Sequence, residues 1–143
     1  MTTFAKVDYA KLDARQKEVY NFYHIAALLA RYGYATHLIR DDWSGGDMFA
    51  RHMLTNEPLT VQIKGRMTFA TKYRGKDLWI AFPDGDGAYL YPHDELLETY
   101  MAVRSARGTP LTENRAWSEG GLVSWSTPTA ELVGLLQPFR LEP

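Results

Sequence analysis

The most promising chemical group in the sequence consists of an acidic residue and two polar residues of a later segment. In residues 59–64 (LTVQIK), strand alternation puts Gln62 and Lys64 side by side on one face and the apolar residues on the other. Asp47 follows a Gly-Gly pair at the start of the preceding strand-like segment. A hairpin between the two segments would bring the Asp47 carboxylate close to the Gln62 side chain.

This group suits the hydrolysis of a phosphodiester bond. A hard cation such as Mg²⁺ or Mn²⁺ prefers oxygen ligands, which the Asp47 carboxylate, the Gln62 amide and the Ile63 backbone carbonyl can supply. Lys64 could orient or help to deprotonate the attacking water, and could stabilise charge on the phosphate. One neutral ligand makes a weaker metal site than two carboxylates would.

Simpler interpretations of these residues stay open. Gln62 and Lys64 also fit the water-facing side of an ordinary amphipathic strand, because such short motifs often arise by chance. Asp47 after two glycines also fits a turn, since Asp tolerates turn conformations.

A basic segment follows the three candidate residues. Residues 64–76 contain no acidic residue, and Phe69 and Tyr73 are interleaved among their basic side chains. The basic residues are Lys64, Arg66, Lys72, Arg74 and Lys76, and Arg31, Arg40 and Arg51 could extend the group. Such a segment can contact the phosphates of a nucleic acid, but it can also be the charged decoration that protects an edge strand.

The segment that precedes these strands is predicted to be a long amphipathic helix over residues 14–32. Asp13 is a suitable cap with Gln16 three residues on, and Gly33 is a typical stop. Six short strand-like segments follow, at residues 35–40, 48–53, 59–64, 67–73, 77–82 and 88–91. The Asp84-Gly85-Asp86-Gly87 stretch predicts a hairpin turn between the last two.

The C-terminal part is predicted to be helical. One helix should begin near His93 or Asp94 and run to about Arg104, and a last helix should begin with Thr127 as cap and end before Pro138. Residues 107–121 between them are expected to form a surface connection. One helix, a run of mostly antiparallel strands and then further helices is an α+β order.

Composition sets the outer limits. The 143 residues suit a single domain over 1–143, and the absence of cysteine excludes disulfides, thiolate zinc sites and a cysteine nucleophile. The net charge of -1 means that any nucleic-acid binding must rest on a local basic patch. With no secretory pattern at the N-terminus and no apolar stretch of membrane-spanning length, no membrane association and a cytoplasmic location are expected.

The Gly-Asp strand, the Val-Gln-Ile-Lys strand, the strand at residues 76–82 and Tyr89-Leu90-Tyr91-Pro92 resemble the PD-(D/E)XK nuclease-like superfamily, in its branch with Gln at the second acidic position. The resemblance covers roughly residues 14–104 and implies a restriction-endonuclease-like core. It implies that Asp47 and Gln62 are metal ligands and that Lys64 is the catalytic lysine. A helix carboxylate, often present in the superfamily, would be Glu18, although the better-spaced position holds Asn21, and Asp42 is another candidate.

The resemblance therefore predicts a metal-dependent endonuclease that acts on DNA. A non-catalytic relative that binds nucleic acid or protein is the alternative, because a neutral Gln62 and a missing helix carboxylate leave little charge to hold Mg²⁺. A small accessory protein without polyanion binding is a third. A chain of this length has little spare surface for recognition, which a homodimer or a partner would supply.

Overall fold

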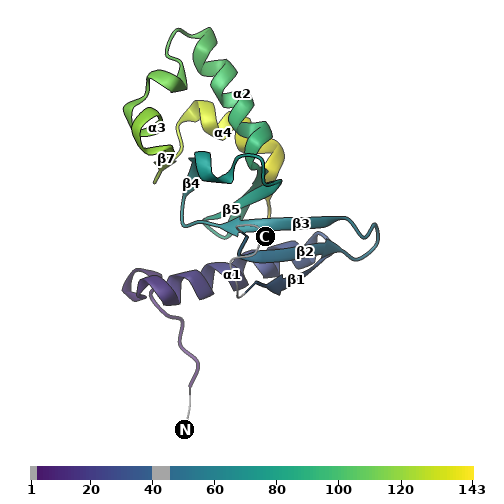
Figure 1. Ribbon diagram of the computed structural model, residues 1–143. Coiled ribbons are helices and arrows are strands. Elements are labelled where there is room, and N and C mark those ends of the chain that lie inside the picture. Colours follow the sequence, from purple (N-terminus) through teal and green to yellow (C-terminus); the bar gives the residue numbers. More distant parts are fainter. Residues whose placement is uncertain (1–2, 40–45) are drawn as a thin grey trace.

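An N-terminal helix, a curled mixed sheet of six strands and a group of C-terminal helices form an α+β fold (Figure 1). The computed structural model describes residues 3–39 and 46–143. After a short 3-10 turn, η1 (Tyr9–Lys11), the chain enters helix α1 (Ala14–Arg31). The order of elements predicted from the sequence, an α+β order, is confirmed.

Helix α1 begins and ends where local chemistry predicts. The Asp13 side chain accepts a hydrogen bond from the Gln16 N–H, and the Gln16 side chain accepts one from the Asp13 N–H. The helix stops before Gly33, whose φ of +88° lies in the left-handed region that favours glycine. Its buried side, which includes Ile25 and Leu29, packs against one face of the large sheet.

The large sheet has the strand order β1-β2-β3-β5-β6-β8. Its strands are β1 (Tyr34–Leu38), β2 (Met48–His52), β3 (Pro58–Ile63), β5 (Leu78–Asp84), β6 (Gly87–Pro92) and β8 (Arg140–Leu141). Neighbours are antiparallel except β3 and β5, which are parallel. Parallel neighbours need a crossover connection, and here the basic segment itself makes it through β4 (Met67–Ala70) and the 3-10 turn η2 (Thr71–Tyr73).

The C-terminal part stacks on the side of the sheet away from α1 (Figure 1). It contains α2 (His93–Ala106), η3 (Leu111–Glu113), α3 (Arg115–Gly120), β7 (Leu122–Trp125), α4 (Ala130–Leu136) and η4 (Gln137–Phe139). Strand β7 pairs with β4 in a separate two-stranded sheet.

Two hydrophobic cores lie on opposite faces of the large sheet. Met48 and Val61 join the core under α1, while Ile80 and Phe82 join the core with β4 and the C-terminal helices. Of β1 to β3, only the face toward α1 packs against a core. Phe49 points to the other face and belongs to neither core, and the β2–β3 hairpin projects beyond the stacked helices (Figure 1). Among residues 3–39 and 46–143, no helix or strand covers the other face of these three strands.

Two expectations about the C-terminal half are wrong, and two strands were missed. Residues 107–121 do not form a plain surface connection, since they contain η3 and α3 and bury Leu111 and Trp117. The last helix begins at Ala130 with Thr129 as its cap, two residues later than expected from Thr127. Strands β7 and β8 were not anticipated, because each pairs with a partner distant in the sequence.

In the part of the chain that the structure describes, no helix combines the length and the apolar character needed to cross a membrane.

Candidate active site

Asp47 and Gln62 are hydrogen-bonded to each other at the junction of β2 and β3. The Asp47 backbone N–H donates to the Val61 carbonyl at 2.8 Å, which extends the β2–β3 ladder by one residue. One Asp47 carboxylate oxygen, Oδ2, accepts from Gln62 Nε2 at 2.7 Å and from the Ile63 N–H at 3.0 Å. The proximity predicted from the hairpin is confirmed, and both side chains are half-buried.

The pairing follows from strand alternation. Met48 and Val61 are register partners and face α1, so the residues next to them, Asp47 and Gln62, face the other way. They stand where the open face of β1–β3 meets the crossover to β5. The site can thus be reached from solvent, and the crossover borders it on one side.

Lys64 continues the same face just beyond the end of β3. Its backbone N–H donates to the Ala81 carbonyl at 2.8 Å, which holds the chain against β5. Its ammonium nitrogen lies 5.4 Å from the ring centroid of Tyr73, and that of Lys72 lies 5.2 Å from the same ring. Two cations therefore flank one aromatic ring of the crossover, and of the two only Lys64 directly follows the strand that holds Gln62.

Glu18 does not join this group. Its side chain is 70% exposed on α1 and pairs with Arg15 at 3.4 Å, and no contact among the described residues links it to Asp47. Asn21, one helical turn further on, is buried. Asp42 and Arg40 lie outside the described residues.

Few groups near Asp47 could serve as donors to a metal. Gln62 contributes its nitrogen to the bond with Asp47, and no hydrogen bond among the described residues uses its amide oxygen. Asp47 supplies a carboxylate, and Ile63 adds a backbone carbonyl. Residues 3–39 and 46–143 contain no cluster of three or more His, Asp or Glu side chains that could hold a metal ion. This donor set fits a hard cation that is bound weakly and keeps several waters.

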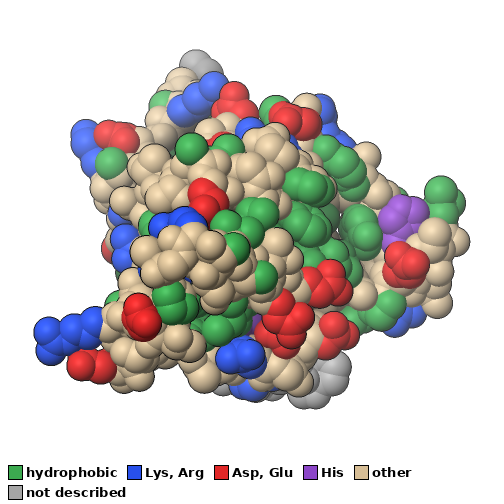
Figure 2. All heavy atoms as spheres, turned by 90° about the horizontal axis from the view of Figure 1, so that it is seen from above, with side chains coloured by type: hydrophobic (Ala, Val, Ile, Leu, Met, Phe, Trp, Pro, Cys, Tyr) green, Lys and Arg blue, Asp and Glu red, His purple; other side chains and the backbone are tan. Residues whose placement is uncertain are grey.

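The basic side chains of the crossover are exposed. Arg66, Lys72, Arg74 and Lys76 take part in none of the salt bridges found in the described part of the chain. Elsewhere charges of both signs are mixed: Figure 2 shows a face on which Lys and Arg are interspersed with Asp and Glu. The crossover is therefore a local basic region on a protein of net charge -1.

A buried polar network that the sequence did not reveal fixes this crossover. His93 Nε2 accepts from the Ala70 N–H at 3.1 Å, and its Nδ1 is 2.8 Å from Asp94 Oδ1. The other Asp94 oxygen accepts from the Gly75 N–H at 2.8 Å. The Tyr91 hydroxyl accepts from the Thr68 N–H at 3.1 Å and donates to the Thr68 carbonyl. From the sequence, His93 was expected only to lie at the start of a helix.

This network shifts the ionisation of its members. Burial lowers the pKa of His93, since charging the ring is costly there. Burial opposes ionisation of Asp94, but hydrogen bonds from the Gly75 N–H and from His93 outweigh it and lower the pKa of that carboxyl. Burial raises the pKa of Tyr91. All three groups are thus held in one protonation state at neutral pH, which suits a structural role.

No family model, curated protein or solved structure matches this chain.

Proposed function

We propose that the protein is a metal-dependent nuclease of the PD-(D/E)XK type that cleaves phosphodiester bonds in DNA. The observation that carries the proposal is the hydrogen-bonded pair of Asp47 and Gln62, with Lys64 just beyond the end of β3. Support for a restriction-endonuclease-like core comes from α1, the antiparallel strands β1 to β3 and the parallel strand β5 beside β3.

Asp47, Gln62 and the Ile63 carbonyl would hold Mg²⁺ or Mn²⁺, which when bound supplies a Lewis acid for the phosphate and lowers the pKa of water. Gln62 orients Asp47 through its amide nitrogen, and the Ile63 N–H fixes the same carboxylate oxygen. The Lys64 ammonium stabilises negative charge on the phosphate that reacts. The exposed cations of the crossover attract the DNA backbone.

A non-catalytic nucleic-acid-binding module is the second candidate. Two observations favour it: Glu18 points its carboxylate at Arg15 instead of the site, and the site has only Asp47 as a carboxylate among the described residues. On this alternative the basic crossover still binds a polyanion, but the protein holds no metal at millimolar concentration.

The test is a cleavage assay on plasmid and single-stranded DNA with Mg²⁺ or Mn²⁺. We expect metal-dependent cleavage by the wild type and a loss of at least about 100-fold in Asp47→Asn and Lys64→Ala. Lys72→Ala is the matched control, because its ammonium flanks the same Tyr73 ring as that of Lys64, but Lys72 lies in η2 and not at the end of β3 next to Gln62. It should cleave within a few-fold of the wild type.

Two outcomes would contradict the nuclease. One is cleavage by folded Lys64→Ala at the wild-type rate. The other is a folded wild type that does not cleave and, in calorimetry, takes up neither metal at millimolar concentration while still binding DNA, which would favour the second candidate.

A further inference from the structure

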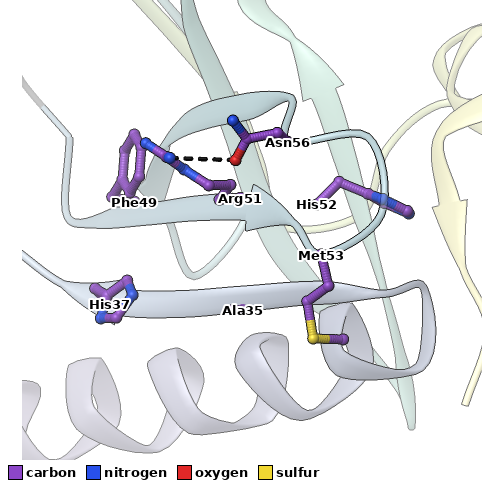
Figure 3. Close-up of a pocket in the computed structure, with 7 residues that line it drawn as sticks. All are labelled: Ala35, His37, Phe49, Arg51, His52, Met53 and Asn56. Carbon is purple, nitrogen blue, oxygen red and sulfur yellow. Dashed lines mark hydrogen bonds between the residues drawn. The ribbon is translucent and has the colours of Figure 1, made fainter.

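A pocket of about 440 Å³ opens on the uncovered face of β1 and β2 (Figure 3). Ala35 and His37 of β1 and Phe49 and Arg51 of β2 line it, together with Asn56 of the following hairpin. The register pairs Ala35 with Arg51 and His37 with Phe49, so these four residues share one face of the sheet. It is the face opposite to α1, where Asp47 and Gln62 also lie.

The lining combines an aromatic ring with a cation. The guanidinium carbon of Arg51 lies 5.6 Å from the ring centroid of Phe49, and Arg51 Nη1 donates to Asn56 Oδ1 at 3.2 Å. Figure 3 shows the Arg51 side chain extending between Phe49 and Asn56. No Asp or Glu of the described residues lines the pocket. An apolar ring beside an unneutralised guanidinium suits a planar, anionic ligand.

The pocket and the candidate active site lie on the same face of β2 and β3. Phe49 follows Asp47 by two residues on the same face of the strand, a separation of about 7 Å along β2. Its register partner is Thr60, which precedes Gln62 by two residues on β3. A chain of nucleotides that crosses the Asp47–Gln62 pair would therefore reach Phe49 within a short distance.

We propose that this pocket binds an unpaired nucleotide of single-stranded DNA, with its base on Phe49 and its phosphate next to Arg51. The preference for an unpaired strand follows from the aromatic ring, because bases inside a duplex are stacked on each other and offer no face to a side chain. This inference rests on the proposed function, because the DNA strand is taken to run along β2 from the Asp47–Gln62 pair to Phe49. It names single-stranded DNA as the class of DNA that the site takes.

The test measures binding in EDTA, so that its result does not depend on cleavage. A fluorescein-labelled oligothymidylate of about 12 nucleotides and a duplex of equal length are titrated at low salt, with fluorescence anisotropy as the readout. We expect Phe49→Leu to weaken binding of the single strand by about 5- to 150-fold, the range for one lost base stack. Phe49→Tyr keeps the ring and should bind as the wild type does.

Arg51→Gln should also weaken binding of the single strand, whereas Arg115→Gln, on α3, is the matched control and should not. Thermal unfolding checks that each variant is folded; if Phe49→Leu is not, Arg51→Gln still decides. The inference is overturned if wild type binds the duplex as tightly as the single strand, or if neither Phe49→Leu nor Arg51→Gln weakens binding. If the binding results are as expected but the protein does not cleave DNA, only the proposed nuclease activity is refuted. If the protein cleaves DNA but the binding results are not as expected, only the proposed nucleotide pocket is refuted.

Discussion

Two polar clusters on the same sheet differ in what surrounds them. The cluster of Tyr91, His93 and Asp94 lies where β6 enters α2, and the side chains of Tyr91 and His93 are fully buried. It bonds mainly to the backbone of the crossover, at Thr68, Ala70 and Gly75. The pair of Asp47 and Gln62 is half-buried and opens to solvent on the uncovered face.

The difference separates a structural from a functional use of polar groups. A buried donor or acceptor that loses its partner costs about 1–3 kcal/mol, because water cannot replace the bond. A half-exposed pair costs little to break, since water reaches it. The stability of the fold therefore depends more on Tyr91 and His93 than on the hydrogen bond between Asp47 and Gln62.

The largest effect on stability is expected for Tyr91→Phe. Removing the hydroxyl leaves both the N–H and the carbonyl of Thr68 without their partner inside the core. The free energy of unfolding should fall by about 1–3 kcal/mol, measured by urea denaturation.

Tyr89→Phe is the matched control for this comparison. Tyr89 lies on the same strand and is also buried, but its hydroxyl makes no hydrogen bond among the described residues. Its loss should change the free energy of unfolding by less than about 0.5 kcal/mol. Equal effects of the two substitutions would show that the Tyr91 hydroxyl has no special role.

The features that were correctly predicted from the sequence are those that depend on interactions between residues close together in the chain. The capping box of Asp13 and Gln16, the stop at Gly33 and the turn at residues 84–87 each depend on neighbours along the chain, and each is present. The proximity of Asp47 and Gln62 could also be predicted, because strand alternation and one hairpin suffice to place the two side chains together.

What the sequence did not predict depends on distant partners. Strand β7 forms by pairing with β4, with Met67 opposite Trp125, and no local pattern announces a partner so far away. Residues 107–121 were expected to form a surface connection, but this segment buries Trp117 in the core of the C-terminal part. The role of His93 depends on Ala70, which precedes it by 23 residues. The catalytic roles of Asp47, Gln62 and Lys64, the single domain and the homodimer stay predictions.

A smaller effect, dependent on pH, is expected from His93. Nε2 must be unprotonated to accept from the Ala70 N–H, and the pKa of His93 is lowered in the folded state. Below the unfolded-state pKa of about 6.5 the unfolded chain binds more protons, so the free energy of unfolding falls as the pH falls. The slope is at most about 1.4 kcal/mol per pH unit and ends at the folded-state pKa.

Urea denaturation between about pH 7.5 and pH 5 measures this slope. The His93→Gln variant should be less stable at neutral pH and should lose most of the dependence in that range. His24, which is half-buried and bonds to the Gly87 carbonyl at 3.1 Å, provides the control. If His24→Gln removed the slope and His93→Gln kept it, the pH dependence would come from His24, and the prediction for His93 would be wrong.

The smallest expected effect distinguishes the Asp47 and Gln62 pair from the buried network. Gln62→Glu replaces the donor to Asp47 by a second carboxylate, and two carboxylates at hydrogen-bond distance repel each other when both are ionised. Because water reaches the pair, the metal-free protein should lose only about 1 kcal/mol or less at neutral pH. Mg²⁺ or Mn²⁺ should then stabilise Gln62→Glu more than the wild type, since a second charged oxygen strengthens the site. Thermal unfolding in EDTA and in millimolar metal measures both effects, and an equal response of the two proteins to metal would mean that no cation is bound between these side chains.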